Sequence, residues 1–361
     1  MDKIMPVFAS NAVTVAFASD ENFVPYMSVM ICSIVDHSSL SRNYDIIILH
    51  RNISSSSQQL LSTIIADRPN FSIRFLDVSA SIDSFQLYTG GKSSFTVDCY
   101  LRLLIPGLLS EHYHKVLYLD GDMVAMTDIA ALYDEDVTGY LLGSTRDLIG
   151  LSLYYDPGEQ LRRYRDKVLK LKKPDDYFVD GMLLLNLDEF RKAITTRELL
   201  QLASSRNWLQ HDQDVLNVLC DGGKARLLDE SWQVLNCPHD PSFLPPELYG
   251  QYLAAYHAPK IIHFGGELKP WRGYQNIYPE EFWKAAAHSP FYLEIIQRAF
   301  QDARSQGSHL TANELYHEVE VRSYQGIVGL KVLLRFILGW FTFKLHKAGL
   351  IKKIQIPQHN D

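Results

Sequence analysis

The sequence predicts an α/β fold in which a sheet is covered by helices on both faces. Apolar strand-like segments alternate with segments of helical periodicity through the first half of the chain, and this alternation favours parallel pairing of the strands. The chain has 361 residues, 47% of them hydrophobic and 21% charged. This is an ordinary globular composition, sufficient to bury a large core. Polar residues follow several strand-like runs, at the sheet edge where open α/β folds bind ligands.

Four strands and three helices are expected in the first half of the chain. Short apolar runs bounded by polar residues predict the strands. Helical spacing of apolar residues, and serines that cap the second helix, predict the helices. In chain order the elements are strand Val13–Phe17, helix Phe23–Val35, strand Tyr44–Leu49, helix Ser54–Ala66, strand Phe71–Leu76, helix Tyr100–Leu109 with Pro106 as a kink, and strand Lys115–Leu119.

The second half has a less regular pattern. The segment 150–173 is polar and charged, which predicts a helix or lid on the surface. Residues after Trp271 are aromatic and of helical character, which predicts a small helical C-terminal subdomain over 276–325. The other expected elements are strand Met182–Leu187, helix Asp188–Ser204, a short helix Asp212–Leu219 capped by Asp212, and strand Lys260–His263.

The C-terminal tail is unusually apolar and then basic. Lys331 and Arg335 are the only charged residues in the run 327–343, and several lysines follow it. The run is too short and too charged for a good transmembrane helix. We expect a basic amphipathic tail over 326–361 that lies on an anionic membrane surface. The alternative is a helix docked on the protein's own core.

Charge and cysteine content restrict partners and compartment. The net charge is −7 and the pI is near 6.0, so no nucleic-acid partner is expected. Four scattered cysteines without a close pair indicate a reducing compartment, and no signal peptide is recognisable. Together with the tail, this predicts a cytoplasmic protein peripherally associated with the inner face of the membrane.

The segment Lys115–Met123 ends in two carboxylates, Asp120 and Asp122, two residues apart. In an extended chain, side chains at this spacing point to the same side. The pair would therefore converge on one hard cation such as Mg²⁺ or Mn²⁺, which usually also holds a phosphate. The alternative is that Asp-Gly-Asp is a polar turn after a strand.

Five ordered motifs between Val13 and Trp271 resemble glycosyltransferase family 8. They are Val15–Phe23, Tyr100–Leu103 followed by Lys115–Asp122, Tyr177–Leu187, His211–Asn217 and His263–Trp271. The resemblance implies a GT-A fold, a Rossmann-like mixed sheet flanked by helices, over 1–275. It also implies a retaining, metal-dependent enzyme that moves glucose or galactose from a UDP-sugar to a glycan or glycolipid acceptor. Similar bacterial enzymes extend lipopolysaccharide or other cell-surface glycans.

The resemblance also implies a metal site at the leaving group. Asp120 and Asp122, with His263 as a third ligand, would hold Mn²⁺, with Mg²⁺ as the competitor. Lys269 would meet the diphosphate as a point charge, in a loop that Gly266 opens to close approach. The alternative for His263 is a core histidine that hydrogen-bonds to backbone groups, and the alternative for Lys269 is a solvated surface lysine.

Other residues would contact the nucleotide and the sugar. The donor-binding residues implied by the resemblance are Ala18, Asp20, Asn22, Arg102, Asp120, Gly121, Asp180, Gly266 and Lys269. For Asp20 and Asn22 the alternative is a helix cap, and for Arg102 it is a structural salt bridge. Trp271 is expected to pack rather than to react.

Asp212 and Gln213 are the catalytic candidates beside the donor sugar. Retention would proceed through a covalent intermediate on a side chain or by front-side displacement. Gln213 is a poor nucleophile, so the front-side route is favoured. The alternative for Asp212 is a helix cap.

The sequence departs from the family pattern at Val179-Asp180, where an asparagine and a small residue usually stand. The departure leaves the identity of the donor sugar open. Asp180 would take over the contact with the sugar that the asparagine usually makes. Two competing interpretations remain. Asp120–Val124 also fits the strand-end pattern of haloacid-dehalogenase-type phosphatases, and a catalytically inactive sugar-nucleotide or glycan-binding protein would carry the same motifs.

Overall fold

The computed structural model describes residues 3–90, 96–157, 161–236, 241–266, 269–272 and 278–305. Residues Met1–Phe300 form one compact unit, and Gln301–Asp361 fall in a second one. The predicted basic tail lies outside the described residues, so it stays a prediction, as do the proposed boundaries at 275 and 325. No helix among the described residues is long and apolar enough to cross a membrane.

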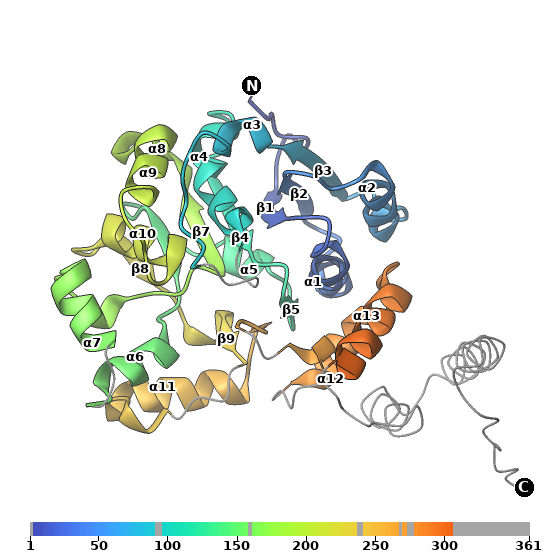
Figure 1. Cartoon of the computed structure of the whole chain (residues 1–361). Coiled ribbons are helices and arrows are strands. Elements are labelled where there is room, and N and C mark those ends of the chain that lie inside the picture. Colours follow the sequence, from blue (N-terminus) through green and yellow to red (C-terminus); the bar gives the residue numbers. More distant parts are fainter. Residues whose placement is uncertain are drawn as a thin grey trace, which may run out of the picture. The chain divides into compact units, whose positions relative to one another are not determined.

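A seven-stranded mixed sheet forms the centre of the unit (Figure 1). Its strand order is β3 (Phe71–Asp77), β2 (Asn43–His50), β1 (Ala12–Ser19), β4 (Lys115–Leu119), β7 (Met182–Asn186), β6 (Leu142–Ser144) and β8 (Ala225–Leu227). The first four strands are parallel, and β7 is antiparallel to both β4 and β6. The predicted α/β class and mixed sheet are therefore confirmed.

Both faces of the central strands are buried. Along β2 every residue from Tyr44 to His50 is buried, which is typical of a strand covered on two sides. One face packs against a large core that includes Ala16, Val116 and Leu183. The helices, in chain order, are α1 (Val24–His37), α2 (Ser55–Ser62), α3 (Ser79–Ile82), α4 (Ile105–Leu108), α5 (Ala130–Tyr133), α6 (Leu148–Tyr155), α7 (Leu161–Arg163), α8 (Leu187–Ala193), α9 (Thr196–Ala203), α10 (His211–Cys220), α11 (Pro246–His257), α12 (Pro279–Ala286) and α13 (Tyr292–Ser305).

A second, three-stranded sheet positions the functional residues. It contains β5 (Met123–Ala125), β10 (Ile261–His263) and β9 (Val234–Leu235). Only β10 was expected from the sequence, as Lys260–His263, and the short strands β5 and β9 were missed. The serine hydroxyl of Ser33 in α1 accepts a hydrogen bond from the Ala125 backbone N–H at 2.9 Å, which ties this small sheet to α1.

Three sequence expectations about helices need correction. The expected helix Asp188–Ser204 is two helices, because Thr195 caps α9 in a reciprocal capping box with Glu198. The segment Tyr100–Leu109 is a 3₁₀ helix (Val97–Leu104) followed by α4, with Pro106 in the first turn of α4. The segment 150–173 is not simply a surface lid, because Arg165 is buried and pairs with Asp147 at 2.8 Å.

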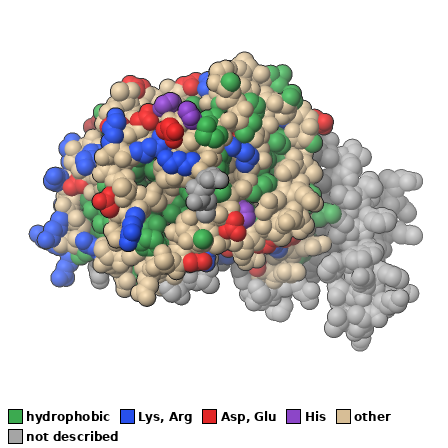
Figure 2. All heavy atoms as spheres, turned by 90° about the horizontal axis from the view of Figure 1, so that it is seen from above, with side chains coloured by type: hydrophobic (Ala, Val, Ile, Leu, Met, Phe, Trp, Pro, Cys, Tyr) green, Lys and Arg blue, Asp and Glu red, His purple; other side chains and the backbone are tan. Residues whose placement is uncertain are grey.

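The outer surface carries charges of both signs. Figure 2 shows one face, on which lysine and arginine side chains are interspersed with aspartate, glutamate and apolar side chains. This distribution matches the balanced composition of the chain.

Candidate active site

Asp120, Gly121 and Asp122 form the turn that joins the two sheets. The strand β4 ends at Leu119 and β5 begins at Met123, so the expectation of an extended Asp-Gly-Asp is wrong. The Asp120 N–H donates to the Gly181 carbonyl at 2.8 Å, and the Phe264 N–H donates to the Asp122 carbonyl at 2.9 Å. A Cβ at Gly121 would lie 2.9 Å from the Cβ of Met27. The turn thus passes too close to α1 for a larger residue.

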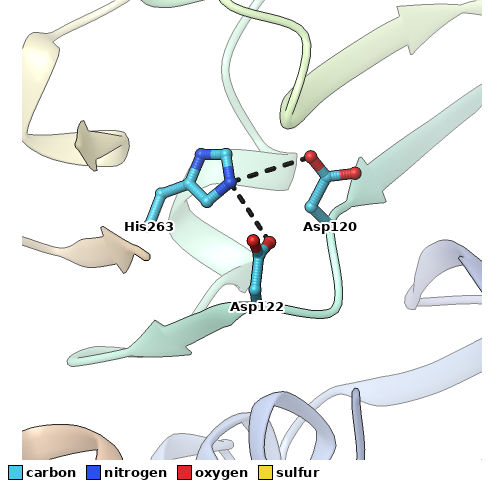
Figure 3. A group of neighbouring side chains, drawn as sticks. All are labelled: Asp120, Asp122 and His263. Carbon is cyan, nitrogen blue, oxygen red and sulfur yellow. Dashed lines mark ion pairs between the residues drawn. The ribbon is translucent and has the colours of Figure 1, made fainter. Parts of the chain in front are cut away.

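The turn and the ligand interpretations of this motif are compatible. Strand pairing sets His263 opposite Met123, which brings its ring next to Asp122. His263 Nε2 lies 3.2 Å from Asp122 Oδ1 and 3.8 Å from Asp120 Oδ2 (Figure 3). One ligand atom from each of the three residues lies within 4.8 Å of the others. Two carboxylates and an imidazole at this spacing suit a divalent cation.

His263 is held by side chains. Its Nδ1 lies 2.8 Å from the side-chain nitrogen of Gln233, and its Nε2 faces the two carboxylates. The alternative of a core histidine satisfied by backbone groups is therefore wrong.

Lys269 points into the site. Its ammonium pairs with Asp122 and donates to the Phe264 carbonyl at 2.7 Å, and only 12% of its side chain is exposed. The solvated-lysine alternative is wrong. Burial alone would raise the pKa of Asp122, but Lys269 and His263 lower that pKa below its ordinary value. Trp271 packs as predicted, with its ring stacked on Tyr26 at 4.0 Å.

Arg102 is a buried cation surrounded by carboxylates. Its guanidinium lies 3.0 Å from Asp120 Oδ1, 3.4 Å from Asp180 Oδ2 and 2.8 Å from Asp212 Oδ2. The guanidinium carbon also lies 4.4 Å from the ring centre of Tyr118. Burial would lower the pKa of Arg102, but the three carboxylates raise it well above its ordinary value. The structural salt-bridge alternative for Arg102 therefore holds in this structure, and it links the metal-ligand candidates to the catalytic candidates.

Asp180 and Asp212 are buried carboxyl groups that both lie beside the Arg102 guanidinium. Burial raises the pKa of Asp180 to about 7, and it also raises the pKa of Asp212. The expectation that Asp212 caps α10 is wrong, because α10 begins at His211 and Asp212 faces Arg102 instead.

The remaining predicted residues make no described side-chain contact with the metal-ligand candidates. Ala18 and Asp20 are half-buried at the carboxyl end of β1, and Asn22 is exposed. Asp20 accepts a hydrogen bond from the Phe23 N–H at 2.8 Å. This bond closes the turn before α1, whose N-cap is Phe23 without a side-chain cap, so Asp20 is not the helix cap. Gln213 is half-buried beside Asp212, and Gly266 has a left-handed backbone with φ of 74°.

Sequence reasoning missed three residues that shape the site. The Tyr118 hydroxyl donates to Asp120 Oδ1 at 2.8 Å, a contact that the i, i+2 spacing could have suggested. Gly181 lies against the His263 ring, since a Cβ there would be 2.5 Å from His263 Cε1. Gln233 carries no local signal, because only the pairing of β9 with β10 brings it next to His263.

The fold and the site define a class of protein. A central Rossmann-like sheet with an Asp-x-Asp turn at its carboxyl edge is the arrangement of GT-A glycosyltransferases. The solved structure of WbbM bifunctional glycosyltransferase in its apo form aligns with a TM-score of 0.73 and 28% identity, over 82% of this chain and 53% of that one. The protein is accordingly a glycosyltransferase of the GT-A type.

Sequence comparison gives the family. The model of Glycosyl transferase family 8 matches residues 14–275, and the chain belongs to this family. General stress protein A of Bacillus subtilis is 22% identical over 281 residues, which cover 73% of this chain and 90% of that protein. Lipopolysaccharide 1,2-glucosyltransferase of Escherichia coli K12 is 26% identical over 193 residues, which cover 52% of this chain and 53% of that protein. Family membership excludes the phosphatase interpretation.

Proposed function

We propose that this glycosyltransferase is retaining and divalent-metal-dependent, and that it moves glucose or galactose from a UDP-sugar to a cell-surface glycan such as lipopolysaccharide. The observation that carries the proposal is the convergence of Asp120, Asp122 and His263 in a chain of this family. The acceptor class is suggested by the similarity to lipopolysaccharide 1,2-glucosyltransferase of Escherichia coli.

The chemistry of these residues fits a nucleotide-diphosphate leaving group. Negative charge develops on the diphosphate as the bond to the anomeric carbon breaks, and a bound cation supplies electrostatic stabilisation of that charge. Asp120, Asp122 and His263 would hold the cation. A donor set of mixed oxygen and nitrogen suits Mn²⁺, with Mg²⁺ as the competitor. Lys269 would add a second positive charge beside the same phosphates.

The local charge favours a cation and a neutral sugar. Four carboxyl groups (Asp120, Asp122, Asp180 and Asp212) are accompanied by the two fixed cations Arg102 and Lys269. Burial raises the pKa of Asp180 to about 7, so the surplus is one negative charge when Asp180 is protonated and two when it is ionised. In both states the site attracts a divalent cation. A further carboxylate on the donor sugar would be repelled. This reasoning supports a neutral hexose over a hexuronic acid.

The engagement of Asp212 supports the front-side route. Its carboxyl group lies 2.8 Å from the Arg102 guanidinium, and such a contact weakens a carboxylate as a nucleophile. Gln213 would orient sugar hydroxyls, and the departing phosphate would accept the proton of the incoming acceptor. Ala18, Asp20 and Asn22 would bind the nucleotide, with Gly121 and Gly266 permitting close approach.

A membrane-associated acceptor would explain the basic C-terminal tail. The lysines beyond residue 343 would bind anionic lipids on the cytoplasmic face of the membrane. Liposome co-sedimentation of the full chain and of a variant ending at Gln325 tests this part. Equal pelleting of the two proteins would refute membrane attachment.

The proposed reaction is tested with a panel of UDP-sugars. We expect sugar release or transfer with UDP-glucose or UDP-galactose, supported by Mn²⁺ and abolished by chelator, with NMR of the product reporting the retained anomer. UDP-glucuronic acid should be a poor donor. Metal-dependent UDP binding without turnover on any donor would instead favour the inactive sugar-nucleotide-binding protein, which the Val179-Asp180 departure from the family pattern also allows.

A further inference from the structure

Gln233 contacts the proposed metal ligand His263 from the side opposite the carboxylates. The Gln233 side-chain nitrogen is 2.8 Å from His263 Nδ1, while His263 Nε2 faces Asp122 and Asp120 (Figure 3). Both residues are buried, with 5% and 8% of their surface exposed. The other end of the same amide, Gln233 Oε1, is buried and has no hydrogen-bond partner among the described residues.

The direction of this hydrogen bond determines which ring nitrogen carries the proton. A neutral imidazole has one N–H and one lone pair. With the amide nitrogen donating to Nδ1, the proton must lie on Nε2, where it points towards the carboxylates and occupies the position of a metal bond. This is the arrangement suited to the metal-free site.

A half-turn of the amide reverses the arrangement. Gln233 Oε1 then accepts a hydrogen bond from Nδ1–H, and Nε2 presents its lone pair towards Asp120 and Asp122. The turn exchanges the positions of the amide oxygen and nitrogen and leaves the rest of the side chain in place. Oε1 has no partner in its present place, so the turn does not break another hydrogen bond. Metal-binding histidines usually donate their second N–H to an acceptor of this kind.

Close packing restricts the side chains of Gln233 and His263. A Cβ at Gly181 would lie 2.5 Å from His263 Cε1 and 2.8 Å from the Gln233 side-chain nitrogen. A Cβ at Gly265 would lie 3.3 Å from His263 Nε2. Parallel pairing of Val234 with Ile262 fixes the backbone of both partners. The ring therefore has little room to rotate away from the carboxylates.

We propose that Gln233 is a positioning residue that selects the metal-binding tautomer of His263 by turning its amide. The inference rests on the metal site of the proposed function. An amide can serve both states of the site, because it donates to the ring when the cation is absent and accepts from it when the cation is bound. It does so without adding a fifth carboxylate to the four already present.

The test compares Mn²⁺ affinity, measured as loss of the free-ion EPR signal, in the purified full chain and three variants. Gln233→Met keeps the volume but removes the acceptor, and we expect a dissociation constant roughly 10- to 100-fold weaker. Gln233→Glu keeps an acceptor and should bind within about threefold of the wild type or more tightly. Gln201→Met, at an exposed position of α9, is the matched control and should leave the affinity unchanged.

The outcomes separate this inference from the function on which it rests. Weak binding by the methionine variant with rescue by the glutamate variant supports it, provided that thermal unfolding shows both variants folded. If the methionine variant unfolds, weak binding by the folded glutamate variant would still overturn the inference. If both Gln233 variants bind Mn²⁺ with the wild-type dissociation constant, the role of Gln233 is overturned and the metal site is not. Absence of Mn²⁺ binding in the wild type, with and without UDP, would overturn the metal site itself.

Discussion

Removal of Arg102 should destabilise the fold as well as the site. The side chain is 6% exposed and lies within 3.4 Å of three carboxyl groups, those of Asp120, Asp180 and Asp212. Arg102→Met retains most of the apolar volume and leaves these carboxyl groups without their cation. Breaking a buried ion pair by removing one partner costs about 3–5 kcal/mol. For a compact unit of this size, the loss corresponds to a melting temperature lower by roughly 6–10 °C.

The pH dependence of the loss provides an internal check. In the variant, the pKa values of the remaining carboxyl groups should rise further above their unfolded values, since Asp180 already has a pKa of about 7 through burial. A carboxyl group whose pKa is higher in the folded than in the unfolded state lowers the free energy of unfolding as the pH increases. The difference in the free energy of unfolding between the variant and the wild type should therefore be larger at pH 8 than at pH 6. Thermal and urea unfolding at the two pH values, with chelator present, measure it.

A surface arginine serves as the matched control. Arg51 pairs with Asp83 at 3.2 Å, but the two side chains are 35% and 57% exposed. Arg51→Met should cost less than about 1 kcal/mol. If Arg102→Met costs no more than this control, the buried-cluster reasoning is refuted. Adding Asp180→Ala to Arg102→Met should restore part of the stability, because it removes one of the unpaired carboxyl groups.

Three further predictions follow from the same cluster and its surroundings. Asp122→Asn removes the negative charge of a proposed metal ligand, so metal-dependent transfer should fall by about 100-fold or more, as initial rates across a Mn²⁺ series would show. Gly181→Ala would set a Cβ 2.5 Å from His263 Cε1, which should weaken Mn²⁺ binding in EPR titration and cost roughly 1–3 kcal/mol in urea unfolding. Burial raises the pKa of Glu230 from 4.5 to about 7. The stability that its protonated form contributes is lost as the pH rises through this window, so Glu230→Gln should flatten the decline of melting temperature between pH 5 and pH 7.5.

The sequence predicted the long elements and missed the short ones for a physical reason. Strands such as β1 and β2 have eight residues each, and their apolar runs are readable because tertiary burial and local pattern coincide. Strands β5 and β9 have three and two residues, too few for any period. The break at Thr195 was missed because the apolar spacing continues across it, whereas the capping box with Glu198 ends one helix and starts the next.

The site was predicted by residue type, but its geometry depends on tertiary pairing. Asp120 and Asp122 were identified from their spacing in an assumed extended strand, and the structure makes them a turn. Asp180 was singled out as a departure from a family pattern, yet its position beside Arg102, which also pairs with Asp212, depends on the tertiary structure and could not be read from the chain. Gln233 lies 30 residues from its partner His263, a separation that carries no local signal.

The proposed metal ligands Asp120, Asp122 and His263 come from two different sheets. For this reason the local sequence around each residue does not show how they are arranged. Asp120 extends the central sheet through its backbone bond to Gly181, whereas Asp122 extends the small sheet through its bond to Phe264. His263 belongs to the small sheet, and Arg102 holds Asp120 on the side of the central sheet. A cation bound by Asp120, Asp122 and His263 would therefore connect the two sheets. Leaving-group binding would then depend on the relative placement of the sheets, while Asp180 and Asp212, on the Arg102 side, would remain to distinguish one sugar from another.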